Sequence, residues 1–436
     1  MQQECLISFD FKTKITINEQ KMVEGAIRQA IIERKSEKNN FVLSFLVAGI
    51  IVTAAGVIAS SLNIIFKHMA YAHHIVDQIP IPSRPMGLSL SDNAQLLYVS
   101  NLGKPIVSII NTTSNKLTDN INIYTNSGVM AVESIPGQKL YVAPFEGGVL
   151  EVYDLNTRNL TKIIPLPNSE IVLTPPPISE QNNGGPLLLS FLTEGWSMTY
   201  NHNNGILYVA NYNANQIDII DTRTDKAVGT ISVPVHPINV KVDSDNGILL
   251  VTSLAGDALT FISTKTNQIL NTISTGAAPW GMDIDNKEKL AYVTNRATDY
   301  ITVVDIPTQR VVAKIPIGAP AQSITVDGNE HAIYASYMDQ PKIVKIDGKT
   351  NTIVNTIDMT VGGGGGTEMI PQDIVSDPSS HTIYVSTKYA NNVFVIGPNA
   401  VSTTLPVIAK DTPAAEVIGI IAAHGLDVQV SAICRH

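Results

Sequence analysis

Apolar and polar residues alternate in short segments over residues 75–400, and one such segment recurs seven times. It is clearest in Tyr292-Val293-Thr294-Asn295. The steps between successive copies are 43, 67, 42, 42, 42 and 50 residues. The central residues of the copies are Tyr98, Tyr141, Tyr208, Leu250, Tyr292, Tyr334 and Tyr384. Alternation with period two predicts half-buried strands. A repeat near 42 residues built only of such strands predicts an all-β, seven-bladed β-propeller of four-stranded blades.

Each repeat divides into four predicted strands, which we call A to D from the axis outwards. Strand B carries the central residue, and an Asp-x-x-Thr turn such as Asp305–Thr308 follows strand C. The side chain of such an Asp bonds the backbone of its own turn. Because strand direction alternates, D–A connections and B–C loops share one face, the top face. A–B and C–D turns share the opposite bottom face.

The ends of the propeller offer one strand D too many. Ile75–Ile81 and Val401–Val407 both match the strand D pattern, and they bound a predicted propeller of residues 75–407. A propeller leaves no long open edge, and pairing its two termini in one blade closes the ring. The seventh C–D turn is degenerate at Gly397, which favours the N-terminal strand as strand D of blade 7.

The repeated Tyr-Val-Thr-Asn string gives the chain a family likeness. It resembles the YVTN-family β-propeller repeat proteins of archaeal and bacterial cell surfaces, over about residues 75–400. Leu250 replaces the tyrosine and Pro144 replaces the asparagine in single copies. The shared residues are strand and turn residues, so the resemblance implies a fold and a cell-surface setting. It does not imply an activity.

One segment is suited to a membrane. Residues 41–66 contain no charged residue, and about twenty apolar residues span a bilayer, so a transmembrane helix is predicted there. Lys and Arg crowd its N-terminal flank, which predicts a single-pass protein of the cell membrane with residues 1–40 cytoplasmic and the propeller extracellular. Residues 1–40 should form a strand near Ile7–Ile17 and an amphipathic helix over Glu19–Lys38. Residues 67–74 form a stem.

The rest of the chain is acidic. Residues 1–40 carry +1 of the formal net charge of −9, which leaves −10 on the remainder and argues against a nucleic-acid partner. The C-terminal tail, residues 408–436, should contain a short helix over Ala414–His424. Of the two cysteines, Cys5 is expected inside the cell and Cys434 outside, so a disulfide between them is excluded.

Few residues suggest chemistry. His202, His331 and His381 fall in A–B turns of different blades, so they are not expected to converge, and we predict no metal and no cofactor. At the axis, nine residues before each central residue, the side chains are mixed, and one Lys and one Asp do not make a catalytic pair. These positions are Ser89, Val132, Thr199, Lys241, Asp283, Thr325 and Val375.

The top face holds the candidate binding residues. The two long insertions, 165–195 and 361–371, are both D–A connections, and insertions on one face of a repeat protein often mark its binding face. Both tryptophans occupy one repeat position at the start of strand A. The candidates are Trp196, Trp280, Glu194, His236 and Arg296. Asn111 and Asn159 match the glycosylation pattern, in C–D turns.

These observations favour a membrane-anchored extracellular scaffold that binds a protein or glycan partner on its top face. An enzyme is the alternative, because propellers with similar repeats include lactonases and a streptogramin-inactivating lyase. A redox or cofactor-binding propeller is a further alternative. The sequence names no ligand.

Overall fold

The computed structural model describes residues 4–11, 73–145, 148–169, 197–360, 369–387, 389–398 and 428–435. The chain divides into two units, Ala72–Pro398 and the combination of Met1–Tyr71 with Asn399–His436. Within the described residues, no helix has the length and apolar character needed to cross a membrane. The expected transmembrane segment 41–66, the amphipathic helix and the tail helix all fall outside those residues.

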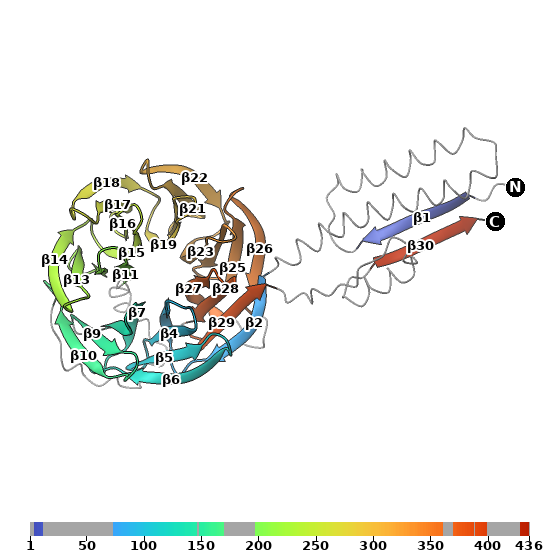
Figure 1. The fold of residues 1–436 in the computed structure, drawn as a ribbon. Helices are drawn as coiled ribbons and strands as arrows, with labels where there is room; N and C mark the ends of the chain where they lie inside the picture. Colours follow the sequence, from blue (N-terminus) through green and yellow to red (C-terminus); the bar gives the residue numbers. More distant parts are fainter. Residues whose placement is uncertain are drawn as a thin grey trace. The chain divides into compact units, whose positions relative to one another are not determined.

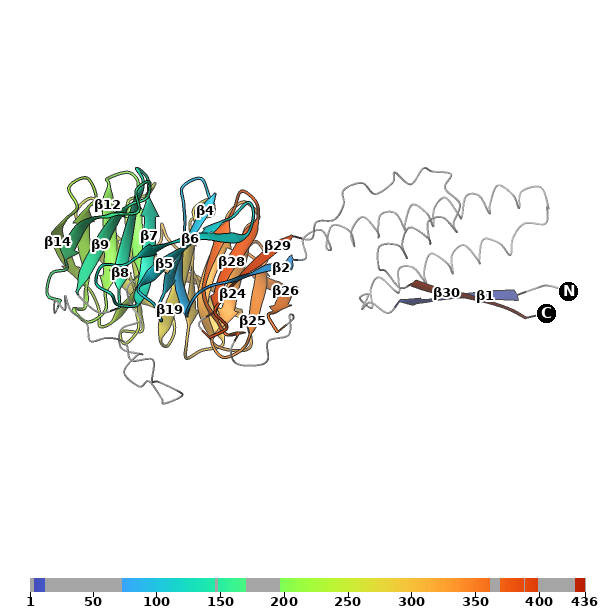
Figure 2. The same cartoon turned by 90° about the horizontal axis from the view of Figure 1, so that it is seen from below.

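The larger unit is a ring of seven four-stranded antiparallel sheets, which confirms the predicted seven-bladed propeller (Figures 1 and 2). Blades 1 to 6 each use four consecutive strands in the order A-B-C-D. Blades 1 and 2 consist of β3 (Pro85–Leu90), β4 (Leu96–Asn101), β5 (Ile106–Asn111), β6 (Lys116–Asn122), β7 (Val129–Ile135), β8 (Lys139–Pro144), β9 (Val149–Asp154) and β10 (Leu160–Pro165).

The same order continues around the ring. Blades 3 and 4 consist of β11 (Met198–Asn201), β12 (Ile206–Asn211), β13 (Gln216–Asp221), β14 (Lys226–Ser232), β15 (Pro237–Asp243), β16 (Ile248–Ser253), β17 (Ala258–Ser263) and β18 (Ile269–Ser274). Blades 5 and 6 consist of β19 (Pro279–Asp285), β20 (Leu290–Asn295), β21 (Tyr300–Asp305), β22 (Arg310–Pro316), β23 (Ala321–Asp327), β24 (Ala332–Tyr337), β25 (Lys342–Asp347) and β26 (Thr352–Asp358).

Blade 7 closes the ring with a strand from the other end of the propeller. Its sheet order is β2-β29-β28-β27, with β27 (Pro371–Asp377), β28 (Thr382–Thr387), β29 (Asn392–Pro398) and β2 (His73–Pro80). The N-terminal strand is therefore strand D of blade 7, as predicted. Residues 401–407 fall outside the described part.

The innermost strands hold the ring together. Each strand A contacts the next strand A around the axis, from β3 through β27 and back to β3. Buried apolar side chains fill the spaces between blades. One such cluster joins Met86 of blade 1 to Tyr141 of blade 2 and Leu207 of blade 3. This packing explains the alternating pattern, because both faces of every central strand are covered by neighbouring blades.

The hydroxyl residue of the repeated string links neighbouring blades. Thr294 Oγ1 accepts a hydrogen bond from the Gly281 backbone N–H of its own blade at 2.9 Å and donates to the Gln322 carbonyl of the next blade at 2.6 Å. Ser386 donates in the same way from blade 7 to the Met86 carbonyl of blade 1, at 2.6 Å. The small polar position of the repeat is thus an inter-blade contact, whereas the asparagine beside it caps the B–C loop. Asn295 Nδ2 donates to the Tyr300 carbonyl at 3.3 Å.

The polypeptide chain enters and leaves the propeller on the bottom face. β2 is antiparallel to β29, a strand C, so it runs from bottom to top. At its start, His73 Nε2 lies 2.9 Å from the carbonyl oxygen of His381, which is in the bottom A–B turn of blade 7. Strand C runs the other way, and its last residue, Pro398, also lies at the bottom. Both covalent links to the rest of the chain therefore leave blade 7 on the bottom face, opposite the two insertions.

In the smaller unit, β1 (Glu4–Phe11) pairs antiparallel with β30 (Val428–Arg435). β1 begins and ends earlier than the strand expected near Ile7–Ile17. Cys5 and Cys434 are register partners in this pair. The sequence analysis had assigned them to different compartments, which is incompatible with the pairing, because paired strands must lie on the same side of a membrane.

Candidate functional site

Exposed apolar side chains distinguish the top face from the bottom face. Outside the strands, the large apolar side chains exposed in the described part of the propeller are Tyr124, Val235, Met338 and Tyr389. All four lie in D–A connections or B–C loops, and hence on the top face. The other exposed ones lie on D strands at the outer rim: Val76, Val228, Ile269, Leu270, Val311, Val312, Ile353 and Val354. Exposed apolar patches often mark interaction sites, and here the loops supply them on one face only.

Trp280 and Arg296 form a stacked pair where strand A of blade 5 begins. The guanidinium carbon lies 3.0 Å from the centroid of the Trp280 ring, so the cation covers one face of the indole. Arg296 Nη2 also donates to Gln322 Oε1 of blade 6 at 2.9 Å, and Gln322 Nε2 donates to the Gln372 carbonyl of blade 7 at 3.2 Å. Both members of the pair are half-buried. Two of the predicted candidates are thus held together and oriented by a network that crosses three blades.

The remaining candidates have different surroundings. The His236 ring stacks on the Tyr212 ring, with centroids 4.2 Å apart and planes at 9°. Its backbone N–H donates to Asn215 Oδ1 at 2.9 Å, so blade 3 supplies both contacts. Trp196 and Glu194 fall outside the described residues. The predicted equivalence of Trp196 with Trp280 therefore stays a prediction.

A ring of strand A residues surrounds the axis below the Trp280 pair. Each of them is the register partner of the central residue of strand B: Ser89, Glu133, Thr199, Lys241, Asp283, Thr325 and Val375. The sequence analysis placed Val132 in this ring, which was wrong. In blade 2 three residues separate the paired Ile135 and Lys139, whereas in blade 5 four separate Asp285 and Leu290. The shorter turn shifts strand A by one residue and brings Glu133 into the ring.

Glu133 changes the chemistry of the axis. Burial raises its pKa from 4.5 to about 7, although the charge of Lys241 acts in the opposite direction. Lys241 Nζ lies 3.2 Å from Asp283 Oδ1, and this carboxylate raises the lysine pKa. The axis therefore carries the Glu133 carboxyl, whose pKa is raised to about 7, together with a lysine and the Asp283 carboxylate, on blades 2, 4 and 5. From the sequence, only Lys241 and Asp283 were expected as charged residues at the axis, and no catalytic pair was predicted there. The shorter A–B turn of blade 2 is the feature of the sequence that would have placed Glu133 at the axis.

A second half-buried carboxylate, that of Asp373, lies at the axis in blade 7. Asp373 Oδ2 accepts from the Leu88 N–H of blade 1 at 3.0 Å, and Asp373 Oδ1 accepts from the Ser323 hydroxyl of blade 6 at 3.0 Å. Burial raises its pKa. Its hydrogen bonds reach the blades on both sides, which indicates a role in fixing the closing blade.

The two glycosylation candidates lie in bottom-face turns, as predicted. Asn159 is exposed in the C–D turn of blade 2. Asn111 is half-buried, and its Oδ1 accepts from the Ser114 N–H at 2.9 Å, as in an Asx turn. Asn159 is thus the more accessible of the two.

No protein-family model and no curated protein sequence matches the chain. Among solved structures, it is similar to Kuenenia stuttgartiensis hydrazine synthase, with a TM-score of 0.58 and 16% sequence identity. The match covers 73% of this chain and 96% of the other. At this identity the similarity concerns the fold alone. The β-propeller is established, and the YVTN resemblance is not confirmed beyond it.

Proposed function

We propose that this protein is a membrane-anchored binding scaffold that takes an extracellular protein or glycan on the top face of its propeller. The observation that carries the proposal is the distribution of exposed apolar side chains in loops. Tyr124, Val235, Met338 and Tyr389 all lie on the face that bears both insertions. Aromatic side chains supply large contact areas in binding interfaces, and two of these four are tyrosines.

The Trp280–Arg296 pair supports the same face. Arginine presents a planar fork of donors that suits carboxylates, and the partly exposed indole suits the apolar face of a sugar or an aromatic side chain. Because Gln322 fixes the guanidinium, little side-chain freedom is left to lose on binding. The pair would therefore favour ligands with an acidic group beside a flat apolar surface.

The direction of the chain supports the orientation. The propeller begins and ends at the bottom of blade 7. Because β2 starts at His73, the stem before it is residues 67–72, which span at most about 21 Å when extended. If residues 41–66 cross the membrane, the bottom face is tethered near the bilayer and the top face is free to meet partners. Protease added to intact cells should then remove the propeller and spare a tag at residue 1. Loss of the tag instead would reverse this topology.

The pairing of β1 with β30 is a direct challenge to this arrangement. A single span at residues 41–66 separates residues 4–11 from the propeller, and β30 follows the propeller in the chain. The two strands can pair only if the chain crosses the membrane again or if the span is absent. If the proposed single span is correct, the membrane-inserted protein keeps β1 and β30 apart, in contrast to their pairing in the structure.

Two double variants test the binding face. Tyr124→Ser with Tyr389→Ser removes exposed apolar area from the top face, and Val312→Ser with Val354→Ser removes it from the outer rim. The full-length protein would be cross-linked to surface material of its own cells, and the captured partner quantified. We expect the first variant to lose at least tenfold in capture and the second to keep it. Equal capture by the two variants would refute the top-face proposal.

An enzyme of lactonase or lyase type is the second candidate, and the state of Glu133 favours it. A general acid or base works best with a pKa near the working pH, and the pKa of Glu133 is raised to about 7 beside a lysine. A panel of lactone and cyclic-ester substrates would be screened with the wild-type chain and with Glu133→Gln. Turnover that depends on Glu133 would establish this function.

A further inference from the structure

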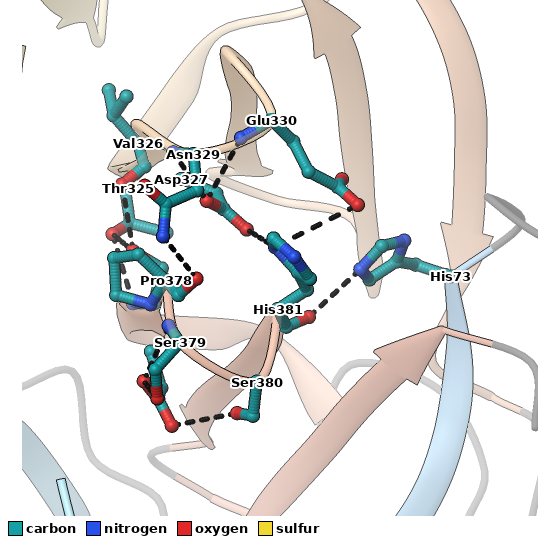
Figure 3. A network of polar contacts seen from close by, with 12 residues as sticks. His73, Thr325, Val326, Asp327, Asn329, Glu330, Pro378, Ser379, Ser380 and His381 are labelled. Atoms are coloured by element: carbon teal, nitrogen blue, oxygen red, sulfur yellow. Dashed lines mark hydrogen bonds and ion pairs between the residues drawn. The ribbon is translucent and has the colours of Figure 1, made fainter. Parts of the chain in front are cut away.

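A cluster of titratable side chains joins blades 6 and 7 on the bottom face (Figure 3). Asp327 and Glu330 come from the A–B turn of blade 6, and His381 comes from the A–B turn of blade 7. His381 Nδ1 lies 2.7 Å from Asp327 Oδ2 and 3.8 Å from Glu330 Oε1. One nitrogen and two carboxylate oxygens lie within 4.8 Å of one another. The sequence analysis expected no such site, because it asked whether histidines of different blades converge. Here one histidine meets two carboxylates of the preceding blade.

A buried hydroxyl beside this cluster has no hydrogen-bond partner among the described residues. Tyr334, the central residue of blade 6, is 0% exposed, and its Oη is unpaired. Lys345 Nζ lies 5.4 Å from the centroid of the Tyr334 ring, and the His73 ring centroid lies 5.2 Å from it. Tyr334 therefore packs against the two residues that contact Glu330 and His381. Buried polar atoms are almost always hydrogen-bonded, so an unpaired hydroxyl here points to a missing ligand or water.

Lys345 fixes the orientation of one carboxylate. Its Nζ donates to Glu330 Oε2 at 3.0 Å and to His73 Nδ1 at 3.1 Å. Glu330 is thus held through one oxygen, while the other, Oε1, turns towards His381. Metal-bound carboxylates are commonly oriented by a hydrogen bond of this kind.

We propose that Asp327, Glu330 and His381 bind a divalent transition-metal ion of the Zn²⁺ class, and that the Tyr334 hydroxyl hydrogen-bonds a water on that ion. Two ligands of a tetrahedral zinc lie about 3.3 Å apart, between the observed separations of 2.7 and 3.8 Å. Histidine nitrogens and carboxylate oxygens are both zinc ligands, and three protein ligands leave the fourth tetrahedral position to a water. Ca²⁺ requires six to eight oxygens, and this site does not supply them.

A second inter-blade contact provides the comparison. Asp285 and Glu288 of blade 5 meet His331 of blade 6, with His331 Nδ1 3.0 Å from Asp285 Oδ2 and 3.5 Å from Glu288 Oε1. Here the glutamate side chain is 51% exposed, against 15% for Glu330. Throughout the described residues, only the blade 6–7 group brings three ligand atoms within 4.8 Å of one another. His331 therefore makes an ordinary contact with the carboxylates of the preceding blade, and its replacement is a matched control.

The metal would bind between blade 6 and blade 7, the blade that closes the ring. His381 belongs to the blade that contains β2, and its carbonyl accepts from His73 at the start of that strand. An ion held between the two turns would couple blade 6 to the closing blade. Metal binding should therefore stabilise the folded propeller as well as occupy the site.

The test is a titration of the full-length protein with Zn²⁺ alone, followed by calorimetry and by the melting temperature. Co²⁺ serves as a spectroscopic probe, because tetrahedral Co²⁺ absorbs visible light strongly. We expect one site whose affinity falls at least 100-fold in His381→Ala and in Glu330→Gln, and is unchanged in His331→Ala. Binding that persists in His381→Ala measures the background from the remaining histidines and the two cysteines.

One further variant and the melting temperatures separate a metal site from a purely structural contact. Tyr334→Phe should lower the affinity for Zn²⁺ by about 10- to 100-fold, the usual effect of losing a group that supports the ligands. Zn²⁺ should raise the melting temperature of the wild type and of His331→Ala, and leave that of His381→Ala unchanged. The proposal is overturned if Zn²⁺ does not saturate a site in the wild type. Equal losses of affinity in His331→Ala and His381→Ala would also overturn it.

Discussion

The hydroxyl of Thr294 offers the sharpest test of how the blades are joined. Thr294→Val keeps the shape of a fully buried side chain and removes its hydroxyl. The Gly281 N–H then loses its acceptor and the Gln322 carbonyl loses its donor. Gly281 lies within the irregular stretch of the β19–β20 register, between Pro279 and Met282, which offers the N–H no replacement.

The expected cost follows from these two bonds. Leaving a buried donor unpaired costs about 1–3 kcal/mol, and the lost bond to the carbonyl adds about 1 kcal/mol. We therefore expect a loss of about 3 kcal/mol in the free energy of unfolding. For a domain of roughly 330 residues, with about 2.1 cal/mol/K of unfolding entropy per residue, this lowers the melting temperature by about 4 °C.

Urea unfolding followed by circular dichroism measures the effect, and Thr260→Val is the matched control. Thr260 is equally buried, but its hydroxyl contacts only the Thr272 hydroxyl of the same blade at 3.3 Å, and Thr272 is exposed to water. We expect the control to lose less than about 1 kcal/mol. Thr294→Ser should stay close to the wild type. If the Thr294 and Thr260 variants lose the same stability, the hydroxyl is not an inter-blade contact of the proposed strength.

Three more predictions concern the axis, the bottom face and the termini. The pKa of Glu133 is about 7 in the folded state and 4.5 ordinarily. As the pH rises from 4.5 to 7, this carboxyl therefore ionises first in the unfolded chain, and the free energy of unfolding falls. Glu133→Gln should therefore match the wild type near pH 4 and exceed it by about 3 kcal/mol above pH 7 in urea unfolding. Tyr141→Phe removes a hydrogen bond to the Asp225 carboxylate and should cost about 1.5–3 kcal/mol in the same assay at pH 7, and an unchanged midpoint would contradict this. In the membrane-inserted protein, oxidation with copper phenanthroline should not join Cys5 to Cys434, and a cross-linked species on a non-reducing gel would refute the single-span topology.

The sequence predicted the ring and its closure because both depend on local, repeated patterns. Alternation and a fixed spacing around Tyr292 define strands and blades, and a strand D pattern at Ile75–Ile81 is enough to assign the closing strand. Side-chain roles across blades were harder to predict. The repeat shows that Asp327 and His381 are both in A–B turns. It does not show that the A–B turn of one blade contacts the A–B turn of the next. Glu133 was missed because the A–B turn of blade 2 is one residue shorter, which shifts the register of β7 against β8 by one residue.

Candidate residues on the top face were only partly predictable for a similar reason. Trp280 stood out because tryptophan is rare in this chain, and Arg296 because a charged residue follows the repeated string. Their stacking depends on the open end of the β19–β20 hairpin, where Pro279 pairs with Asn295, and on Gln322 of the next blade. No pattern within one repeat carries that information.

Closure of blade 7 by β2 also decides how the propeller bears mechanical load. If residues 41–66 anchor the chain as proposed, a partner that pulls on the top face pulls against His73, the bottom end of β2. That force runs along the strand, so the hydrogen bonds between β2 and β29 are loaded together in shear. A tether attached at Pro398 would load β29, which is paired on both sides. A pull between the two bottom ends would instead open the β2–β29 pair one bond at a time. The fold therefore resists a pull between its top face and His73 better than a pull between His73 and Pro398.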